Sequence, residues 1–295
     1  MKRLLAAPAS PFGLVVASLA FAAVLVFAGC GEDEESEPAA TPAAEASACD
    51  KEQLELANAG MLTVGTDKPA FPPYFEDDDP TNGRGFESAV AYAIADQLGF
   101  AESEVDWTVV PFNVSFAPGP KDFDFDLNQI SINEKRQRAV DFSEPYYTAG
   151  QAVVAAKGSS AAKATSLDDL ADATLGVQLG TTSLDAVTEA IQPSEDPKVF
   201  DDSNAVVTAL RQNQVDAVVI DLPTAFYLTA AQVPSATIVG QFEAPGVDEW
   251  GALLEKDSPL TACVSQAITS LRESGELDRI TQRWMGGAAG APELT

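Results

Sequence analysis

The side chains best suited to chemistry stand where three expected strands end. Arg136 follows an alternating apolar-polar segment within one turn, and Asp221 ends the apolar run "VDAVVID". Thr181 and Thr182 follow a glycine at which a strand gives way to a helix. A guanidinium fork suits a carboxylate, free N–H groups at a helix start favour an anion, and an aspartate can accept from an ammonium group. Together these positions predict a site for a zwitterion such as a free amino acid.

Each position also has a plain structural interpretation. The turn at Thr181 could simply cap its helix, and it lacks the lysine and second glycine of a nucleotide-binding loop. Asp221 could cap the helix that follows, although ligands of open α/β sheets do bind at this edge. A single arginine in such a run usually lies at the surface, as we expect for Lys135 and Arg138.

Alternating strand and helix patterns from about residue 54 onward must position these side chains. Strands are predicted over 61–67, 105–112 and 123–132. A helix is predicted within 87–100, with Gly99 as its C-terminal stop signal. Capped helices are predicted from Ser166 and from Ser258, and the last helix covers 276–284. This alternation indicates α/β architecture, with mostly parallel sheets covered by helices in one or two domains.

Composition restricts the possible partners. The chain has 45 acidic and 17 basic residues, a formal charge of −28, which argues against nucleic acid or an anionic membrane surface as partner. It has no histidine, so Ser-His-Asp triads and histidine metal sites are excluded. We expect no metal and no cofactor.

The N-terminal segment is typical of an export signal. A basic start precedes an apolar run over 14–28, which is short for a membrane span. The run ends in Ala-Gly-Cys and resembles a bacterial lipobox, although Phe27 stands where leucine is usual. The resemblance implies a lipoprotein signal peptide over 1–29 and lipidation of Cys30; an ordinary signal peptide or an uncleaved anchor are the alternatives. Residues 30–49 lack large apolar side chains and are predicted to be a lipid-anchored disordered tether.

Two further cysteines, Cys49 and Cys263, remain. Outside the cytoplasm such a pair favours a disulfide, which would tie the start of the folded part to a late helix. Two buried thiols are the alternative.

Five stretches occur in an order that resembles family 3 of the bacterial extracellular solute-binding proteins. They are "GMLTVGTDKPAFPPYFE", "GFESAVAYAIADQLG", "ISINEKRQRAVDFSEPYYTAGQAVV", "LGVQLGTTS" and "VDAVVIDLP", within residues 50–286. The third stretch is the most specific. The resemblance implies a two-lobe periplasmic-binding-protein fold of type II, with a ligand cleft between the lobes. Lobe 1 would comprise 54–149 plus 241–286, lobe 2 would comprise 150–240, and 287–295 would be a flexible tail.

The resemblance also assigns roles to individual residues. Arg136 would bind the ligand carboxylate with Thr181 and Thr182, helped by Ser131, and Asp221 would accept from the ammonium group. Gln129 would face the cleft and Asp67 would lie near the ligand side chain. Phe71 or Tyr74 would supply the aromatic lid, in a loop longer than the common form. Glu87 stands where the family usually has aspartate.

The function implied is that of an extracytoplasmic substrate-binding component of an ABC importer, and not an enzyme. It would bind a free polar or basic amino acid as a monomer, attach to the outer face of the cell membrane through its lipid, and deliver the ligand to a membrane permease. An amino-acid sensor is one alternative. A dehydratase-like enzyme on the same fold is another, with Asp67, Glu76, Glu87 or Asp221 as its general acid.

Overall fold

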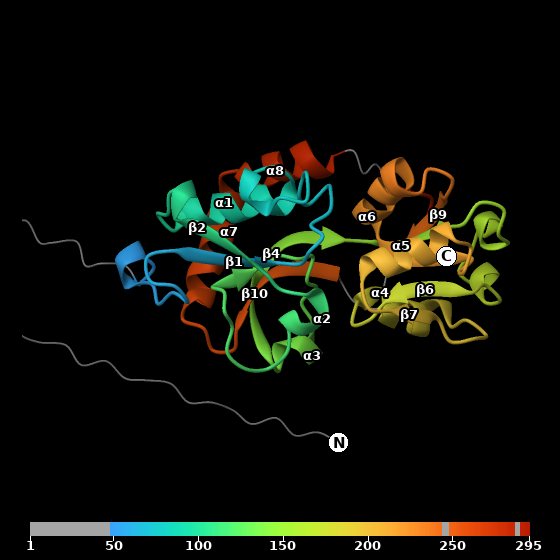
Figure 1. Cartoon of the computed structure of the whole chain (residues 1–295), viewed down its shortest axis with the longest axis horizontal. Coiled ribbons are helices and arrows are strands. Elements are labelled where there is room, and N and C mark those ends of the chain that lie inside the picture. The colour runs from blue at the N-terminus through green and yellow to red at the C-terminus, as the bar shows by residue number, and fades with distance from the viewer. Residues whose placement is uncertain (1–47, 244–247, 287–289) are drawn as a thin grey trace, which may run out of the picture. The chain divides into compact units, whose positions relative to one another are not determined.

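The computed structural model in Figure 1 describes residues 48–243, 248–286 and 290–295. The predicted signal peptide, Cys30 and nearly all of the tether lie outside the described residues. Within the described ranges, no helix is long and apolar enough to cross a membrane.

The first sheet has the strand order β2-β1-β3-β10-β4. Its strands are β1 (Leu62–Thr66), β2 (Val105–Val109), β3 (Phe125–Asp126), β4 (Val140–Ala149) and β10 (Asp248–Glu255). The first three are parallel, and β10 runs antiparallel to both of its neighbours. Helices α1 (Phe86–Gln97), α7 (Leu260–Glu273) and α8 (Glu276–Met285) share one apolar core with this sheet. A smaller core on the opposite face contains side chains next to the short helices α2 (Phe112–Ser115) and α3 (Glu134–Gln137).

The second sheet has the order β7-β6-β8-β5-β9. Its strands are β5 (Gln151–Ala155), β6 (Leu175–Gln178), β7 (Lys198–Phe200), β8 (Ala217–Asp221) and β9 (Thr237–Phe242). The helices are α4 (Thr182–Ala186), α5 (Ser203–Arg211) and α6 (Leu222–Tyr227), and π-helical turns continue α4 as η6 (Val187–Ile191) and α6 as η7 (Leu228–Gln232). Separate apolar cores cover the two faces. Strand β5 is buried throughout, and Ala217–Val219 of the central strand β8 are buried too, which explains their runs of valine and alanine.

The chain passes between the two sheets in two places. Only Gly150 separates the end of β4 in the first sheet from the start of β5 in the second. The return passage lies between Phe242 and Asp248. Figure 1 shows the resulting two lobes side by side, with β4 pointing toward the second. Strand β9 stays in the second sheet to Phe242, two residues beyond the end predicted for lobe 2.

The described part of the C-terminal tail, which the sequence predicts to be flexible, pairs with the edge strand β9. The backbone N–H of Gln241 donates to Pro292 O, and the N–H of Leu294 donates to Gln241 O, each at 2.8 Å. The Leu294 side chain is buried in a core of the second lobe. A Cβ atom on Gly240 would lie 2.5 Å from Pro292 O, so only glycine lets the tail come so close. One apolar side chain and a free strand edge therefore hold a segment whose composition predicts fraying.

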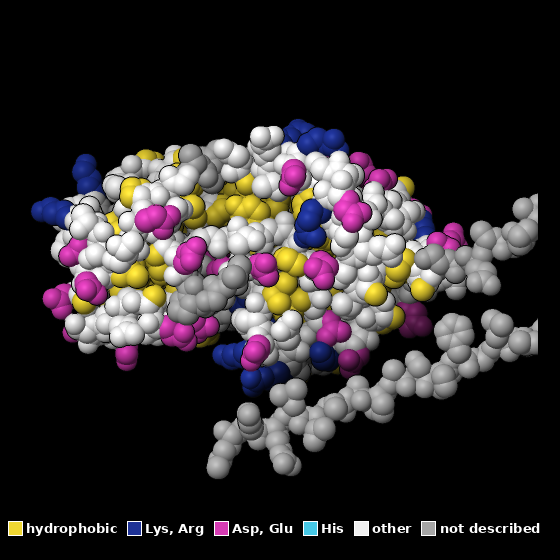
Figure 2. Space-filling view, turned by 180° about the vertical axis from the view of Figure 1, so that it is seen from behind, with side chains coloured by type: hydrophobic (Ala, Val, Ile, Leu, Met, Phe, Trp, Pro, Cys, Tyr) yellow, Lys and Arg dark blue, Asp and Glu magenta, His cyan; other side chains and the backbone are white. Residues whose placement is uncertain are grey.

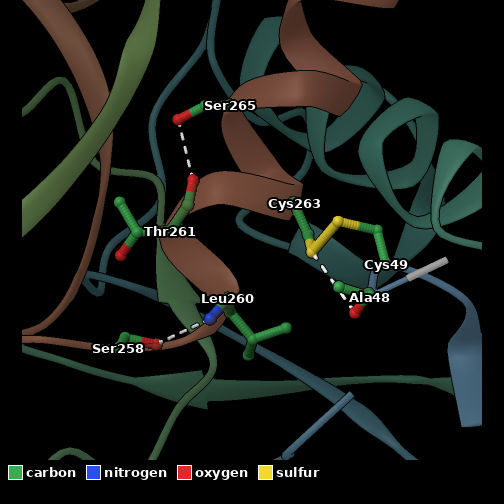
Figure 3. Close-up of a disulfide and its surroundings, with 7 residues drawn as sticks. All are labelled: Ala48, Cys49, Ser258, Leu260, Thr261, Cys263 and Ser265. Carbon is green, nitrogen blue, oxygen red and sulfur yellow. Dashed lines mark hydrogen bonds between the residues drawn. A yellow bond between two sulfur atoms is a disulfide. The ribbon is translucent and has the colours of Figure 1, made fainter. Parts of the chain in front are cut away.

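Cys49 and Cys263 form a disulfide, which confirms the predicted bridge. Their Cα atoms are 5.3 Å apart, within the range that the bond requires. Figure 3 shows that the bond joins the start of the described chain to helix α7, close to Ala48.

The remaining helical pieces are single 3-10 turns: η1 (Lys51–Gln53), η2 (Pro80–Asn82), η3 (Glu102–Glu104), η4 (Ala161–Lys163) and η5 (Asp168–Leu170).

Candidate ligand-binding site

A cleft of about 940 Å³, counting its open mouth, lies between the two lobes. Residues of both lobes line it, as expected for a two-lobe binding protein. The predicted site residues that line the cleft are Asp67, Phe71, Tyr74, Gln129, Ser131, Thr181, Thr182 and Asp221. Arg136 is the predicted ligand-binding residue that does not line it. Of the acids considered for catalysis, Asp67 and Asp221 line the cleft, whereas Glu76 and Glu87 do not.

Arg136 lies behind the cleft surface rather than on it. Its guanidinium donates to the backbone carbonyl of Ser131 at 2.6 Å and to that of Gly180, in the other lobe, at 2.9 Å. It also stacks over the rings of Phe112 and Phe116, at 5.5 and 4.8 Å from their centroids. Burial lowers its pKa to about 10, so it stays cationic at neutral pH. The structure thus makes Arg136 a cationic contact between the lobes, while Lys135 and Arg138 are exposed, as expected.

The hydroxyl groups at the start of α4 are already engaged. Thr181 Oγ1 donates to Gln178 O at 2.8 Å and accepts from the backbone N–H of Leu184 at 3.2 Å, so it does cap the helix. Thr182 Oγ1 donates to Asp248 Oδ2 at 3.1 Å. A hydroxyl has one proton to donate, so an anion at this turn would meet backbone N–H groups rather than these hydroxyl protons.

Asp221 ends β8 and precedes α6, but its side chain makes no capping hydrogen bond. Instead its Oδ1 accepts from Nε2 of Gln151 at 2.8 Å. Burial, and then the charge of Asp248, raise the pKa of Asp221 well above its usual range. A ligand cation beside Asp221 would favour its ionised form, so an ammonium site is the better of the two interpretations.

Asp67 faces Asp202 across the cleft. The carboxylate of Asp67 accepts from the backbone N–H of Lys68 at 2.6 Å and from that of Phe112 at 3.1 Å. Burial raises its pKa against the effect of these two bonds, and the charge of Asp202 raises it further. Asp202 caps α5 through the N–H of Ala205, at 2.8 Å. Two carboxylates from different lobes therefore give this part of the cleft a negative potential.

The aromatic residues of the long loop have different surroundings. Phe71 is half-buried, with its ring centroid 6.4 Å from that of Tyr227 in lobe 2. Tyr74 is buried, and its hydroxyl lies 2.8 Å from Thr224 Oγ1 of lobe 2. Phe71 is therefore the more accessible ring for stacking on a ligand, and Tyr74 contributes a polar contact between the lobes.

The carboxylate of Glu87 accepts two hydrogen bonds from the cleft residue Gln129. The backbone N–H of Gln129 donates to Glu87 Oε1 at 2.7 Å, and its side-chain amide donates to Glu87 Oε2. Tyr146 also donates its hydroxyl proton to Glu87 Oε1, at 2.5 Å. Burial raises the pKa of Glu87 to about 7. Gln129 has a φ of 48°, an uncommon conformation for a non-glycine residue, and these hydrogen bonds hold it there.

Sequence reasoning missed several residues of the site. Phe112, Asn128, Gln178, Asp202 and Thr224 also line the cleft. Gln178 ends a strand just before the Gly180 turn, and Thr224 follows Asp221 closely, so their positions could have identified them. Gln151 and Asp248 lie behind the lining residues and are 97 positions apart, and no local pattern joins them.

Sequence comparison relates the chain to known binding proteins. The pattern of the family described as bacterial extracellular solute-binding proteins, family 3, matches residues 62–287. The L-cystine-binding protein TcyJ of Escherichia coli K12 is 28% identical over 230 residues, 77% of this chain and 83% of that protein. The arginine-binding extracellular protein ArtP of Bacillus subtilis is 29% identical over 232 residues, 77% of this chain and 86% of that protein.

Solved structures agree with this relationship. An ancestral arginine-binding protein bound to glutamine is 32% identical, with a TM-score of 0.66, and the match covers 77% of this chain and 98% of that one. The ancestral amino acid-binding protein AncCDT-1, described as a precursor of cyclohexadienyl dehydratase, is 30% identical with a TM-score of 0.63, covering 76% and 95%. The two mixed sheets, the cleft between them and these matches have one explanation. The chain belongs to family 3 of the bacterial extracellular solute-binding proteins.

Proposed function

We propose that this protein binds one free amino acid in the cleft and passes it to the permease of an ABC importer. The observation that carries the proposal is the convergence of Asp67, Gln129 and Ser131 of lobe 1 with Thr182 and Asp221 of lobe 2 on one cleft. An ammonium group would lie beside Asp221, and a carboxylate would meet the start of α4, with Arg136 adding positive charge from behind.

The ligand side chain is polar or basic in this proposal. Asp67, Asp202 and Asp221 line the cleft, and Lys68 is the cation among the lining residues that the structure describes. The Nζ of Lys68 lies 3.3 Å from Asp78, which offsets its charge. Acidic side chains are also widespread on the face shown in Figure 2. An acidic ligand side chain would meet repulsion here, whereas a neutral or cationic one would not.

The lobes close on the ligand in this proposal. Contacts from lobe 1 to lobe 2, such as Tyr74 with Thr224 and Arg136 with Gly180, need the lobes to be close. A ligand that touches both lobes favours the closed arrangement through its differential contacts. We propose lobe boundaries at the two passages, near Gly150 and between Phe242 and Asp248.

We propose further that the protein acts as a monomer, held outside the cytoplasm by a lipid on Cys30. The family is extracellular, and the residues before Cys49 supply both the lipobox-like sequence and the tether. Membrane fractionation and mass spectrometry of the N-terminal peptide, with Cys30→Ser as the matched variant, test the anchor.

Thermal unfolding against the twenty amino acids tests the function. A ligand at 100 times its dissociation constant adds about 2.7 kcal/mol to the free energy of unfolding, which shifts the melting temperature by a few degrees. One or a few amino acids should stabilise the wild type and not Asp221→Ala. Stabilisation by none of them would contradict the proposal, and consumption of a ligand during incubation would favour the dehydratase alternative.

A further inference from the structure

Two carboxylates, the buried one of Asp248 and the partly buried one of Asp221, meet where the chain passes between the lobes. On the continuous chain that forms β4 and β5, Ala149 pairs with Asp248 of lobe 1. Two residues later, Gln151 pairs with Asp221 of lobe 2. The crossing strand therefore brings together one acid from each lobe, although they lie on different sheets.

The side chain of Gln151 joins these two acids. Its Nε2 donates to Asp221 Oδ1 at 2.8 Å and to Asp248 Oδ2 at 2.7 Å, which uses both protons of the amide. Its Oε1 accepts from Ser183 Oγ at 2.7 Å, so the amide orientation is fixed. Gln151 has no exposed surface, and Asp248 is 6% exposed.

One oxygen of this network is left over. Asp248 Oδ2 accepts from Gln151 and from Thr182 Oγ1, but Asp248 Oδ1 has no hydrogen-bond partner among the described residues. A buried carboxylate oxygen without a partner is costly, and so are two like charges that share one amide. Among the carboxylates, Asp248 acts most strongly on the charge of Arg136. The positive charge of Arg136 therefore offsets one of the two negative charges. A second positive charge beside the pair would offset the other.

From this arrangement we propose that Asp248 is a second carboxylate of the amine-binding end of the cleft. With Asp221 it forms a carboxylate pair, one member from each lobe, that makes the α-ammonium group of the ligand a requirement for closure. The proposal rests on the proposed function and adds a specificity-determining residue to it. Asp221 contacts the ammonium group, and Asp248 acts through Gln151 and Thr182.

The physical reason is the sign of the charge. When the lobes close, Asp221 and Asp248 come together and repel each other. A ligand ammonium beside Asp221 removes that repulsion and stabilises the closed arrangement. A ligand that has a hydroxyl group in place of the amine brings only its negative carboxylate and leaves the repulsion in place. Asp248 therefore favours α-amino acids over α-hydroxy acids of the same shape.

The test is calorimetric titration of the full chain with a matched pair of ligands. The probe is the amino acid that stabilises the protein most in the thermal panel, together with its α-hydroxy analogue; for L-arginine this is L-argininic acid. We expect Asp248→Asn to weaken binding of the amino acid about tenfold and to leave binding of the hydroxy acid unchanged or tighter. Asp248→Glu, which keeps the charge, should retain most of the preference for the amine.

Asp278→Asn is the control, because it removes the same charge from an exposed position on α8 and should change neither affinity. If Asp248→Asn does not fold, Asp248→Ser replaces it as a smaller neutral variant. Equal weakening of both ligands would show a merely structural role and overturn the inference, leaving the proposed function intact. Binding of no amino acid by the wild type would overturn both.

Discussion

At the scale of single residues, burial distinguishes side chains that look equivalent in the sequence. Arg136 and Arg138 lie two positions apart, yet only the first is buried between the lobes. Glu87 and Glu76 are both acids near the first lining segment, yet only Glu87 is fully enclosed. A buried charge interacts strongly with its few neighbours, so these are the positions where a substitution should have a large effect.

Arg136→Ala should weaken ligand binding by about 2–5 kcal/mol, because it removes the cation that offsets a desolvated carboxylate and the bond to Gly180 O. Arg138→Ala should change affinity little, since Arg138 is exposed. Calorimetric titration of both variants checks this, and equal effects from the two would contradict it.

Glu87 should make stability depend on pH. Its pKa is raised from 4.5 to about 7, so the folded state binds the proton more tightly than the unfolded state does. The stability from this group is full below about pH 4.5 and is lost as pH rises to about 7. The wild type loses this stability between pH 4.5 and pH 8, whereas Glu87→Gln does not. The free energy of unfolding of Glu87→Gln minus that of the wild type should therefore rise by up to about 3 kcal/mol over this range. Urea unfolding at the two pH values measures this gap, and a gap that stays constant would contradict the prediction.

At the scale of elements, several predicted patterns form elements of a different length. The segment after Ser166 has a capped-helix pattern and forms only the turn η5, although the Asp169 carboxylate accepts from the backbone N–H groups of Thr165 and Ser166 as in a helix cap. The strand expected over 123–132 shortens to β3 (Phe125–Asp126), and Gln129, three residues after its end, is not in the extended conformation. Helix α1 begins one residue before its predicted start, and its Val90 and Ile94 lie in the core of the first lobe.

The disulfide fastens one such element to another. Replacing both Cys49 and Cys263 by serine should lower the free energy of unfolding by about 2–5 kcal/mol, because the bond closes a separation of 214 residues. Ligand affinity should stay unchanged, since neither cysteine lines the cleft. Denaturant unfolding and titration check the two parts, and wild type under reducing conditions is the control. Unchanged stability would show that the bond is dispensable.

At the scale of the whole described unit, each lobe is built from two separate segments of the chain. After α8 in lobe 1, residues 290–295 return to lobe 2 and extend its sheet beyond β9. The contact depends on Leu294 filling an apolar position and on Gly240 giving access to the strand edge. These residues lie 54 positions apart (294 minus 240), so no local pattern links them.

Leu294→Asp should release this tail, because a charge would replace a buried apolar side chain. The backbone N–H of Gln241, which now donates to Pro292 O, should then exchange with solvent faster. Hydrogen-exchange measurements on β9 check this, with Thr295→Asp as the control, since Thr295 is exposed. Unchanged protection at Gln241 would mean that the tail stays docked without its apolar contact.

The sequence by itself determined the α/β class, the family and eight of the residues that line the cleft. These follow from periodicity and from short motifs, in which neighbours along the chain are also neighbours in space. Only the tertiary structure decided that Arg136 lies behind the cleft, that Glu87 holds Gln129, and that Gln151 joins Asp221 to Asp248. Such contacts bring together segments far apart in the chain. Burial and hydrogen bonding then set the orientation and pKa of each group, and no local pattern contains that information.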